Sequence, residues 1–291
     1  MILIVGCGFL GSYLAKHISA ASGERVLAVV RNSENVLQLN NTEYVCCDVT
    51  NTQQIKMLAE KTKGERLTVF YFAACHNIDF VYRNPGKARE INITALDNFL
   101  NEFDNIEKLF FASTDCVYGE NGNIEFLDEA GELNPVSEYG RQKAEAEKIV
   151  AAKGFTSVRL PFMLGPSLFD GRPHFYDRIK ASLQNGQSVE MIDGLYRNVM
   201  SYSQTAELLF ALSKHSGALP GVINVCSDTG MSKYQMGCRL AEYFGFSDEL
   251  IVRISEKEGE KFFTDKRASS SVMDNSLLKS LLEIDEIKWE I

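Results

Sequence analysis

The stretch that decides the fold is Ile2-Leu3-Ile4-Val5-Gly6-Cys7-Gly8-Phe9-Leu10-Gly11, at the start of the chain. Its four apolar residues predict a short buried strand, and residues 9–20 repeat apolar side chains at helical spacing. The pattern G-x-G-x-x-G thus stands between a strand and a helix. There the first glycine permits a tight turn, the second lets the backbone approach a pyrophosphate, and the third lets the helix pack closely. A turn that serves packing alone could carry the same glycines, but this context favours dinucleotide binding.

The first 160 residues alternate short apolar runs with helical patterns. Strands are predicted at 2–5, 25–30, 43–47, 68–72, 108–112 and 156–159, and helices at 9–20, 52–61, 85–103 and 137–152. Strict alternation of this kind indicates βαβ units and a parallel sheet with helices on both faces. The sequence therefore predicts a doubly wound α/β fold of the Rossmann type.

The rhythm changes after Arg159, where prolines and glycines punctuate a loop-rich stretch. Helical patterns return at 204–215 and 232–244, with a predicted strand at 222–225 between them. We expect residues 1–160 to form a dinucleotide-binding domain. Residues 161–291 should form a smaller, partly interleaved C-terminal substrate lobe, some segments of which return to the Rossmann sheet.

The composition excludes several classes of protein. Of 291 residues, 45% are hydrophobic and 24% are charged, and the formal net charge is −9. Such a charge argues against partners such as nucleic acid or anionic membranes, although a few local arginines could still hold a small phosphorylated ligand. Apolar runs such as 69–75 are too short for a membrane span, which needs ~20 residues.

The N-terminal residues lack a basic segment of the kind that opens a signal peptide. The seven cysteines and four histidines show no spacing typical of a metal site, so no metal is expected. Most of the thiols are expected to be reduced core residues. The sequence therefore predicts a cytoplasmic protein.

The end of the second predicted strand indicates the cofactor. The run Val29-Val30-Arg31-Asn32-Ser33 carries no acidic residue to accept hydrogen bonds from a ribose hydroxyl, whereas Arg31 with Ser33 suits a 2′-phosphate. NADP(H) is therefore favoured over NAD(H), unless Arg31 stacks on the adenine or faces solvent. Asp48, after the third strand, is expected to bind the adenine amine, or else to cap the next helix.

Two segments combine a tyrosine with a lysine four residues later, Tyr139 with Lys143 and Tyr176 with Lys180. Residues at this spacing are neighbours on one helix face, so a lysine can lower the pKa of a phenol that transfers a proton. Tyr139 opens a helix that follows a strand ending in Ser113-Thr114-Asp115, where ligands of parallel sheets bind. We therefore expect Tyr139 to be catalytic and Tyr176 to serve packing or the substrate lobe.

Taken together, these motifs resemble the extended short-chain dehydrogenase/reductases, in particular the NAD(P)-dependent epimerase/dehydratase group that acts on nucleotide-sugars. The resemblance covers nearly the whole chain. It rests on Gly6–Gly11, Phe72-Ala73-Ala74, Asn92, Ser113-Thr114-Asp115-Cys116-Val117-Tyr118-Gly119, residues 139–143 and Arg159-Leu160-Pro161.

The resemblance implies roles for individual residues. Thr114 would hold the substrate oxygen beside Tyr139, and Lys143 would also bind the nicotinamide ribose. The cofactor-binding set is then Gly6, Gly8, Phe9, Leu10, Gly11, Arg31, Asp48, Ala73 and Lys143, and the substrate-binding set is Asp115, Arg197 and Arg267. Arg197 and Arg267 would contact the phosphates of the nucleotide-sugar.

The details favour one branch of that family. Related dehydratases carry Thr-Asp-Glu at the strand end, whereas this chain has Cys116 in place of the glutamate. The chain therefore looks more like the dTDP-4-dehydrorhamnose reductases, and we expect it to reduce the 4-keto group of a nucleotide-sugar. A nucleotide-sugar epimerase with tightly bound NAD is the alternative, and a non-catalytic dinucleotide-binding regulator is a third.

Three points stay open at this level. His76 could contact the substrate, relay a proton or simply bond to backbone. Ser203 and Gln204 replace two aspartates of the family pattern, which weakens any transfer of its substrates. The helices at 85–103 and 137–152 could pair with a second subunit, so a homodimer is possible.

Overall fold

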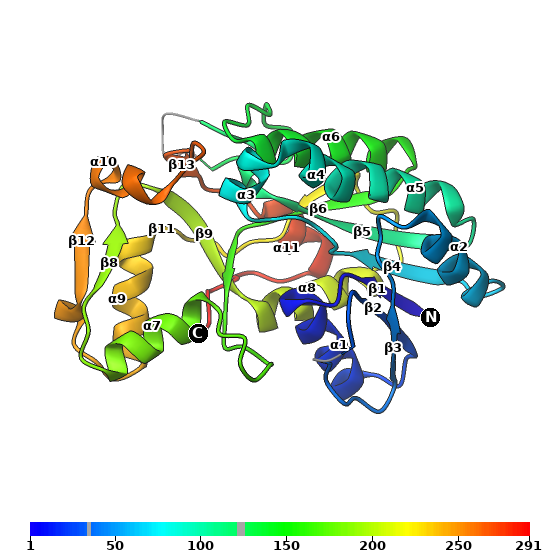
Figure 1. Cartoon of the computed structure of the whole chain (residues 1–291), viewed down its shortest axis with the longest axis horizontal. Coiled ribbons are helices and arrows are strands. Elements are labelled where there is room, and N and C mark those ends of the chain that lie inside the picture. Colours follow the sequence, from blue (N-terminus) through cyan, green and yellow to red (C-terminus); the bar gives the residue numbers. More distant parts are fainter. Residues whose placement is uncertain (34–35, 121–125) are drawn as a thin grey trace.

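The computed structural model describes residues 1–33, 36–120 and 126–291, and within them seven parallel strands form one central sheet (Figure 1). The strand order is β10-β6-β5-β4-β1-β2-β3, which confirms the predicted Rossmann-type α/β fold. The strands are β1 Ile2–Val5, β2 Val26–Val30, β3 Thr42–Cys46, β4 Leu67–Tyr71, β5 Ile106–Thr114, β6 Thr156–Leu160 and β10 Val222–Asn224.

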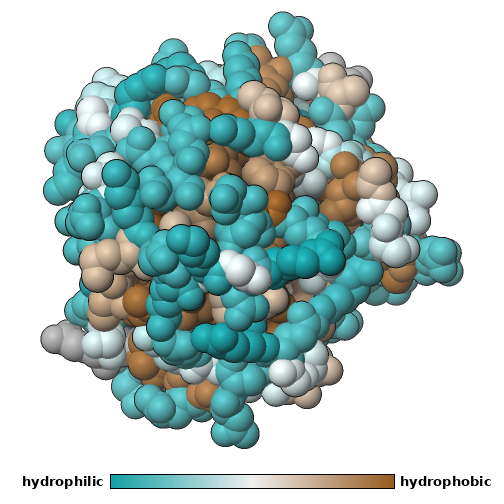
Figure 2. Space-filling model, turned by 90° about the vertical axis from the view of Figure 1, so that its right-hand side faces the viewer, coloured by the Kyte–Doolittle hydropathy of each residue, from teal (hydrophilic) through white to brown (hydrophobic). Residues whose placement is uncertain are grey.

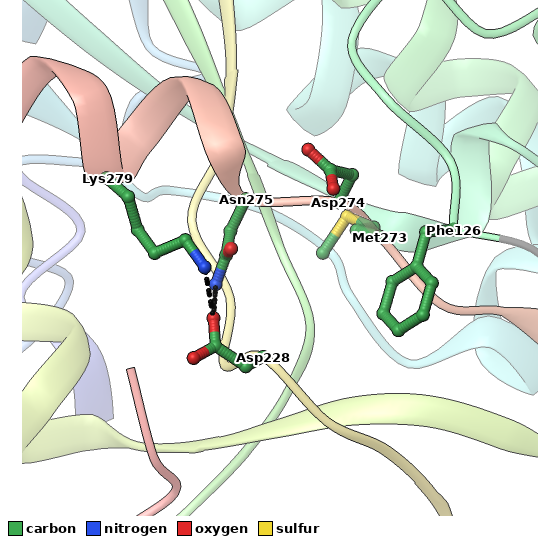
Figure 3. A pocket seen from close by; sticks show the side chains of 6 residues that line it. All are labelled: Phe126, Asp228, Met273, Asp274, Asn275 and Lys279. Carbon is green, nitrogen blue, oxygen red and sulfur yellow. Dashed lines mark hydrogen bonds and ion pairs between the residues drawn. The ribbon is translucent and has the colours of Figure 1, made fainter. Parts of the chain in front are cut away.

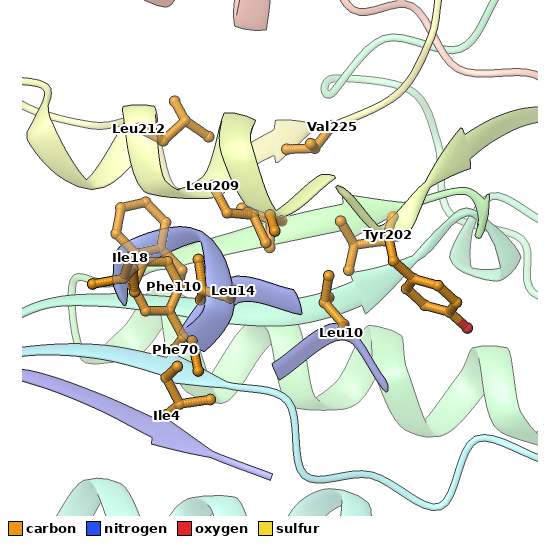
Figure 4. Packing of buried hydrophobic residues seen from close by; sticks show 14 of the residues in the cluster. Ile4, Leu10, Leu14, Ile18, Phe70, Phe110, Tyr202, Leu209, Leu212 and Val225 are labelled. Carbon is orange, nitrogen blue, oxygen red and sulfur yellow. The ribbon is translucent and has the colours of Figure 1, made fainter. Parts of the chain in front are cut away.

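Two hydrophobic cores lie on the two faces of this sheet. Alternate residues of a strand face opposite sides, so Ile2 and Ile4 enter one core while Leu3 and Val5 enter the other. Figure 4 shows the first core, where Leu14 of α1 and Leu209 of α8 meet around Ile4, Phe70 and Phe110. β1 is buried on both faces, as a central parallel strand must be.

The flanking helices divide between these cores. On the first face lie α1 Phe9–Ala21, α8 Tyr202–Lys214 and α11 Ser276–Leu282. On the second face lie α2 Thr52–Lys61, α5 Ala95–Glu102 and α6 Glu138–Ala152. The short helices α3 Ile78–Arg83 and α4 Pro85–Arg89 precede α5.

The predicted single helix at 85–103 is interrupted. It begins as α4, passes through a π-helical turn at Glu90–Thr94 and continues as α5. The wider turn is stabilised by a buried hydrogen-bonding side chain, Asn92, so the interruption has a local cause. Helical periodicity alone does not reveal such a turn.

The second half of the chain contributes to both lobes. β10 extends the central sheet beside β6, and α8 packs against α1 on its first face. Residues after 160 therefore contribute to both lobes. The domain boundary at residue 160 stays a prediction.

The substrate lobe contains strands that the sequence analysis missed. β9 Tyr196–Ser201 pairs with β7 Phe162–Leu164, β11 Gly230–Ser232 and β13 Ser270–Ser271, and β8 Val189–Ile192 pairs with β12 Ile251–Ile254. Its helices are α7 Phe175–Gln184, α9 Lys233–Tyr243 and α10 Glu256–Gly259. Short 3-10 turns lie at Asp115–Val117, Asp248–Leu250 and Glu260–Phe262.

The surface is mainly polar on the face shown in Figure 2, where hydrophobic residues show as separate patches. Among the described helices, none combines the length and the apolar character that crossing a membrane requires.

Candidate active site

The glycine loop between β1 and α1 leaves room for a ligand on one side only. Gly6 has φ of +93°, and a Cβ there would lie 2.4 Å from the backbone nitrogen of Ala73. At Gly11 a Cβ would lie 2.9 Å from the carbonyl oxygen of Gly6. Gly8, by contrast, has no heavy atom within 4 Å of a Cβ position. The loop is thus closely packed at Gly6 and Gly11, and free space adjoins it at Gly8.

The N-terminus of α1 faces this open side. No side chain caps the helix at Gly8, and its first turn contains no acidic residue. The amides of Phe9 and Leu10 belong to that first turn, where backbone N–H groups have no partner within the helix. An uncapped helix N-terminus attracts anions, so the loop fits the pyrophosphate of a dinucleotide.

Helix α6 carries the tyrosine and the lysine to the carboxyl end of β5. Ser137 caps the helix by accepting a hydrogen bond from the Gly140 amide at 3.1 Å. A Cβ at Gly140 would lie 2.5 Å from the carbonyl oxygen of Cys116, so the missing side chain lets α6 press against the segment after β5. This contact brings Tyr139 beside the turn that follows Thr114.

Tyr139 and Lys143 are both buried, and burial favours the neutral form of each. Burial is the largest effect that raises the pKa of Tyr139, and the neighbouring Cys116 and Asp115 add to it. The Tyr139 pKa is therefore raised in this structure and not lowered, contrary to the expectation from the neighbouring lysine, because desolvation is the largest effect on it. Burial also lowers the pKa of Lys143 to about 7, although the carboxylate of Glu147 opposes that shift.

The surroundings of Lys143 are largely apolar. Its side chain is 1% exposed, and Nζ lies 3.7 Å from the centre of the Phe111 ring. Glu147 is occupied elsewhere, since it accepts hydrogen bonds from Ser113 and from the Arg159 guanidinium at 2.8 and 3.0 Å. The lysine is therefore held close to its neutral form, ready to gain or lose a proton near pH 7.

This burial predicts a gain in stability for Lys143→Met. In the unfolded chain the lysine stays protonated up to its ordinary pKa of 10.5, whereas the folded pKa is about 7. The unfolded state therefore binds more protons between these pH values, and the wild-type free energy of unfolding should rise as pH increases from 7 to 10. We expect Lys143→Met to raise it at pH 7 by on the order of 3 kcal/mol and to abolish that rise.

Urea denaturation of the ligand-free protein at pH 7 and pH 10 measures this effect. Lys148→Met, on the exposed side of α6, is the matched control and should match the wild type. A Lys143→Met protein less stable than wild type at both pH values would contradict the electrostatic account.

Asp115 and Arg197, both predicted to bind substrate, are bound to each other. Arg197 donates to the Asp115 carboxylate at 2.6 Å and to the Ser271 hydroxyl at 2.7 Å. Although burial disfavours its charge, Asp115 raises the pKa of Arg197. Thr114 donates its hydroxyl proton to the other oxygen of Asp115 at 3.0 Å. The ion pair therefore orients the Thr114 hydroxyl and joins β5 to the substrate lobe.

Asn92 locks the loop after β4 against α6. In the π-helical turn, its Oδ1 accepts from the amide of Cys75 at 2.8 Å, while its Nδ2 donates to the Cys75 carbonyl at 3.1 Å. Nδ2 also donates to Oε1 of Gln142 at 3.0 Å. These bonds fix the register of α6, and hence of Tyr139, beside the sheet edge.

Arg31 lies after β2, exposed at the same edge. Its positive charge lowers the pKa of Asp48, after the larger effects of the hydrogen bonds from the backbone and hydroxyl of Thr50. These bonds measure 3.0 and 2.8 Å. The interpretation of Asp48 as a helix cap is wrong, because Asn51 caps α2 by accepting from Gln53 and Gln54. Asp48 and Asn51 are only three residues apart in the turn before α2, so the sequence alone does not show which of them caps the helix.

Three further predicted residues take different places. Desolvation of the His76 ring, followed in effect by the Lys143 charge, lowers its pKa, while the Ala74 backbone opposes the shift. Arg267 pairs with Asp79 of α3 at 3.2 Å, which ties the C-terminal segment across the site. Tyr176 packs against Phe244 with ring centres 5.0 Å apart, in the core of the substrate lobe.

A small cavity lies beside Arg197 and Arg267. Its lining residues are Ile78, Cys116, Val136, Ser137, Arg197, Lys266, Arg267 and Ala268. Among the described residues, no group of three or more His, Cys, Asp or Glu side chains is arranged to hold a metal ion.

A larger pocket of about 200 Å³ lies away from this site, below the start of α11 (Figure 3). Asp228 accepts hydrogen bonds there from Lys279 at 3.0 Å and Asn275 at 2.8 Å, and from the amide of Ile287. Its charged groups thus satisfy one another, and they fasten the C-terminal segment.

The chain is similar to characterised proteins. Residues 2–226 match the profile of the "NAD dependent epimerase/dehydratase family". UDP-glucose 4-epimerase of Mycoplasma genitalium is 26% identical over 160 residues, which cover 52% of this chain and 46% of that protein. dTDP-D-glucose 4,6-dehydratase of Dictyostelium discoideum is 24% identical over 273 residues, covering 82% and 61%.

Solved structures share the fold. dTDP-4-dehydrorhamnose reductase of Bacillus anthracis, in complex with NADP, superposes with a TM-score of 0.79 at 16% identity, covering 99% of this chain and 94% of that one. The chain spans between 46% and 61% of the length of the two curated relatives above. Because the family profile covers more than three quarters of the sequence, the chain belongs to the NAD dependent epimerase/dehydratase family.

Proposed function

We propose that this protein is an NADPH-dependent reductase of a nucleotide-sugar that carries a 4-keto group. The observation that supports this most is the placement of Tyr139 and Lys143, one turn apart on α6, against the end of β5 that carries Thr114. The open glycine loop lies at the same carboxyl edge of the sheet. A nicotinamide dinucleotide bound there would supply the hydride.

The protein's own residues would then handle the proton. Tyr139, kept protonated by burial, would donate its phenolic proton to the alkoxide that develops at the sugar oxygen. Thr114, oriented by Asp115, would hold that oxygen in place. Lys143, in its protonated form, would stabilise the phenolate that this transfer leaves behind.

Arg31 carries the preference for NADP(H). An exposed guanidinium at the end of β2 can reach a 2′-phosphate, which NAD lacks. We expect Arg31→Ala to weaken NADP binding about 10- to 100-fold, as loss of a charged hydrogen bond does. NAD binding should change less than twofold. Fluorescence titration of both cofactors measures this, and equal losses for the two would refute a role in selecting the phosphate.

The second candidate is a nucleotide-sugar epimerase. An epimerase would use the same Thr114, Tyr139 and Lys143, and one curated relative is a UDP-glucose 4-epimerase. A 4,6-dehydratase is less well supported, because Cys116 stands where the resembled dehydratases have a glutamate, and burial raises its pKa to about 11. Such a thiol is a poor base at neutral pH.

A panel of UDP- and dTDP-linked 4-keto sugars, incubated with NADPH, separates the candidates. A reductase consumes NADPH in proportion to product. An epimerase interconverts nucleotide-sugars and leaves its cofactor unchanged after turnover. Purified protein that binds a nicotinamide dinucleotide but converts no nucleotide-sugar would instead support the non-catalytic regulator.

We further propose that the protein works in the cytoplasm as a homodimer, as the resemblance to the family suggests. The helices α5 and α6 would pair with those of a second copy. Analytical ultracentrifugation of the purified protein reports this state directly.

A further inference from the structure

The segment 264–267 links the substrate lobe to the helix that carries Tyr139. Just before it, Phe263 packs against a small core that contains Ile192 of β8 and Ile254 of β12. Shortly after it, the chain forms β13, which pairs with β9 of the same lobe. Both ends of the segment are therefore fixed in the substrate lobe, while its middle contacts α3 and α6 of the first lobe.

Asp265 lies in the middle of this segment with a buried carboxylate. The residue is 7% exposed. Its Oδ2 accepts a hydrogen bond from the amide of Glu138, and its Oδ1 accepts one from the amide of Lys266, both at 2.8 Å. Among the described residues it has no ion-pair partner. Because a buried charge is costly unless hydrogen bonds satisfy it, these amides and the positive end of the α6 dipole stabilise the carboxylate where it lies.

The hydrogen bond from Glu138 holds the backbone directly before Tyr139, since Glu138 is the first residue of α6. The first amides of a helix have no partner within the helix. In α6, Ser137 accepts from the Gly140 amide and Asp265 accepts from the Glu138 amide. One anchor of the first turn is thus local, whereas the other comes from the substrate lobe.

Asp79 of α3 holds the segment in register. Its Oδ1 accepts from the amides of Thr264 at 2.8 Å and Asp265 at 3.1 Å, and from the Arg267 guanidinium at 3.2 Å. Arg83 of the same helix donates to the Thr264 hydroxyl. The Asp265 carboxylate therefore has a defined position, and it can serve as a fixed point for the start of α6.

We propose that Asp265 is a positioning residue for Tyr139, through which the substrate lobe holds the start of α6 in place. The inference rests on the proposed function, because it takes Tyr139 as the proton donor. Proton transfer requires the phenol to lie within hydrogen-bond reach of the sugar oxygen beside Thr114, and a displacement of about 1 Å can cost on the order of 10²-fold in rate. Docking of the substrate lobe thereby aligns the proton donor of the other lobe.

Amide hydrogen exchange, followed by mass spectrometry of a peptide that covers the start of α6, tests the anchor without any substrate. The variants are Asp265→Ala, Asp265→Asn and the matched control Asp274→Ala, whose carboxylate accepts from the Ser276 amide at the start of α11 at 2.9 Å. We expect exchange in α6 to be about 10- to 100-fold faster in Asp265→Ala, the usual effect of losing a hydrogen bond to a charged group. Asp265→Asn keeps an acceptor oxygen, so it should exchange nearly as slowly as wild type, and so should Asp274→Ala.

Steady-state kinetics on the same proteins test the consequence for Tyr139. Asp265→Ala should lower kcat for the reduction about 10- to 100-fold while KM for NADPH stays within about twofold of wild type, which shows that the protein is folded. Asp265→Asn should restore most of the turnover. Asp274→Ala should keep the wild-type kcat, because α11 carries no residue of the proposed site. A purely structural contribution would act on both alanine variants alike.

Unchanged exchange in α6 of Asp265→Ala would overturn the proposal, as would equal kcat values for Asp265→Ala and Asp274→Ala. Faster exchange in α6 of Asp265→Ala, together with a wild type that oxidises no NADPH on any 4-keto nucleotide-sugar, would have a different meaning. It would remove the reductase function and leave the anchoring of α6 by Asp265 standing.

Discussion

Tyr139→Phe is expected to lower turnover of the preferred nucleotide-sugar about 10²- to 10⁴-fold, the range that general acid catalysis contributes. The change removes one oxygen from a buried side chain whose burial keeps the phenol protonated. It leaves the glycine loop and the fold of α6 intact, so the dissociation constant for NADPH should stay within twofold of wild type. Steady-state kinetics and a cofactor titration on the same preparation measure both quantities.

Tyr176→Phe is the matched control for this substitution. Tyr176 has the same spacing to a lysine, Lys180, but packs in the core of the substrate lobe. Its hydroxyl should therefore be dispensable for turnover. Retained activity in Tyr139→Phe, or an equal loss in Tyr176→Phe, would show that Tyr139 is not the proton donor.

Glu147→Ala should destabilise the protein by about 3–5 kcal/mol, the usual effect of removing one partner of a buried ion pair. Glu147 and Arg159 side chains are 6% and 3% exposed, and the carboxylate accepts two guanidinium hydrogen bonds and one from Ser113. Although burial disfavours the guanidinium charge, Glu147 raises the pKa of Arg159, so the arginine would stay charged without its partner. Urea denaturation at pH 7 measures the loss.

The double variant Glu147→Leu with Arg159→Met separates the buried charge from the loss of packing. Replacing both partners with apolar residues of similar volume leaves no buried charge, so it should recover most of the lost stability. A double variant as unstable as Glu147→Ala would assign the effect to packing around Ser113 and Tyr118 instead of electrostatics.

The sheet could be predicted because its signals are local. Most central strands are short apolar runs, and α1 and α2 each begin within a few residues of the strand before them. After β1 the glycine motif adds a further signal, because it predicts a tight turn where a side chain would not fit. The close approach of Gly6 to the Ala73 backbone confirms that turn. Local patterns therefore sufficed for the first lobe.

The substrate lobe could not be predicted in the same way. β13 has two residues and β7 has three, and both pair with β9 from distant parts of the chain. Strands this short carry no periodicity, and their pairing depends on tertiary contacts. The helix α3 was missed for a similar reason, since its six residues are too few for a helical pattern.

The motif residues of the candidate site could be named from the sequence, but the residues that support them could not. Tyr139, Lys143 and Thr114 belong to recognisable patterns, whereas Glu147 shows nothing in sequence of its ion pair with Arg159. The sequence did offer one signal for Glu147. It lies four residues after Lys143, which places both side chains on the same face of the helix.

The most direct test of the central claim follows hydride transfer to a UDP- or dTDP-linked 4-keto sugar. NADPH deuterated at the nicotinamide C4 would be incubated with the wild-type protein and, in parallel, with Tyr139→Phe. The account predicts that wild type consumes NADPH in equal amount to product and places deuterium at the sugar C4, while Tyr139→Phe is nearly inactive. Product without deuterium, or no consumption of NADPH with any 4-keto nucleotide-sugar, would contradict it.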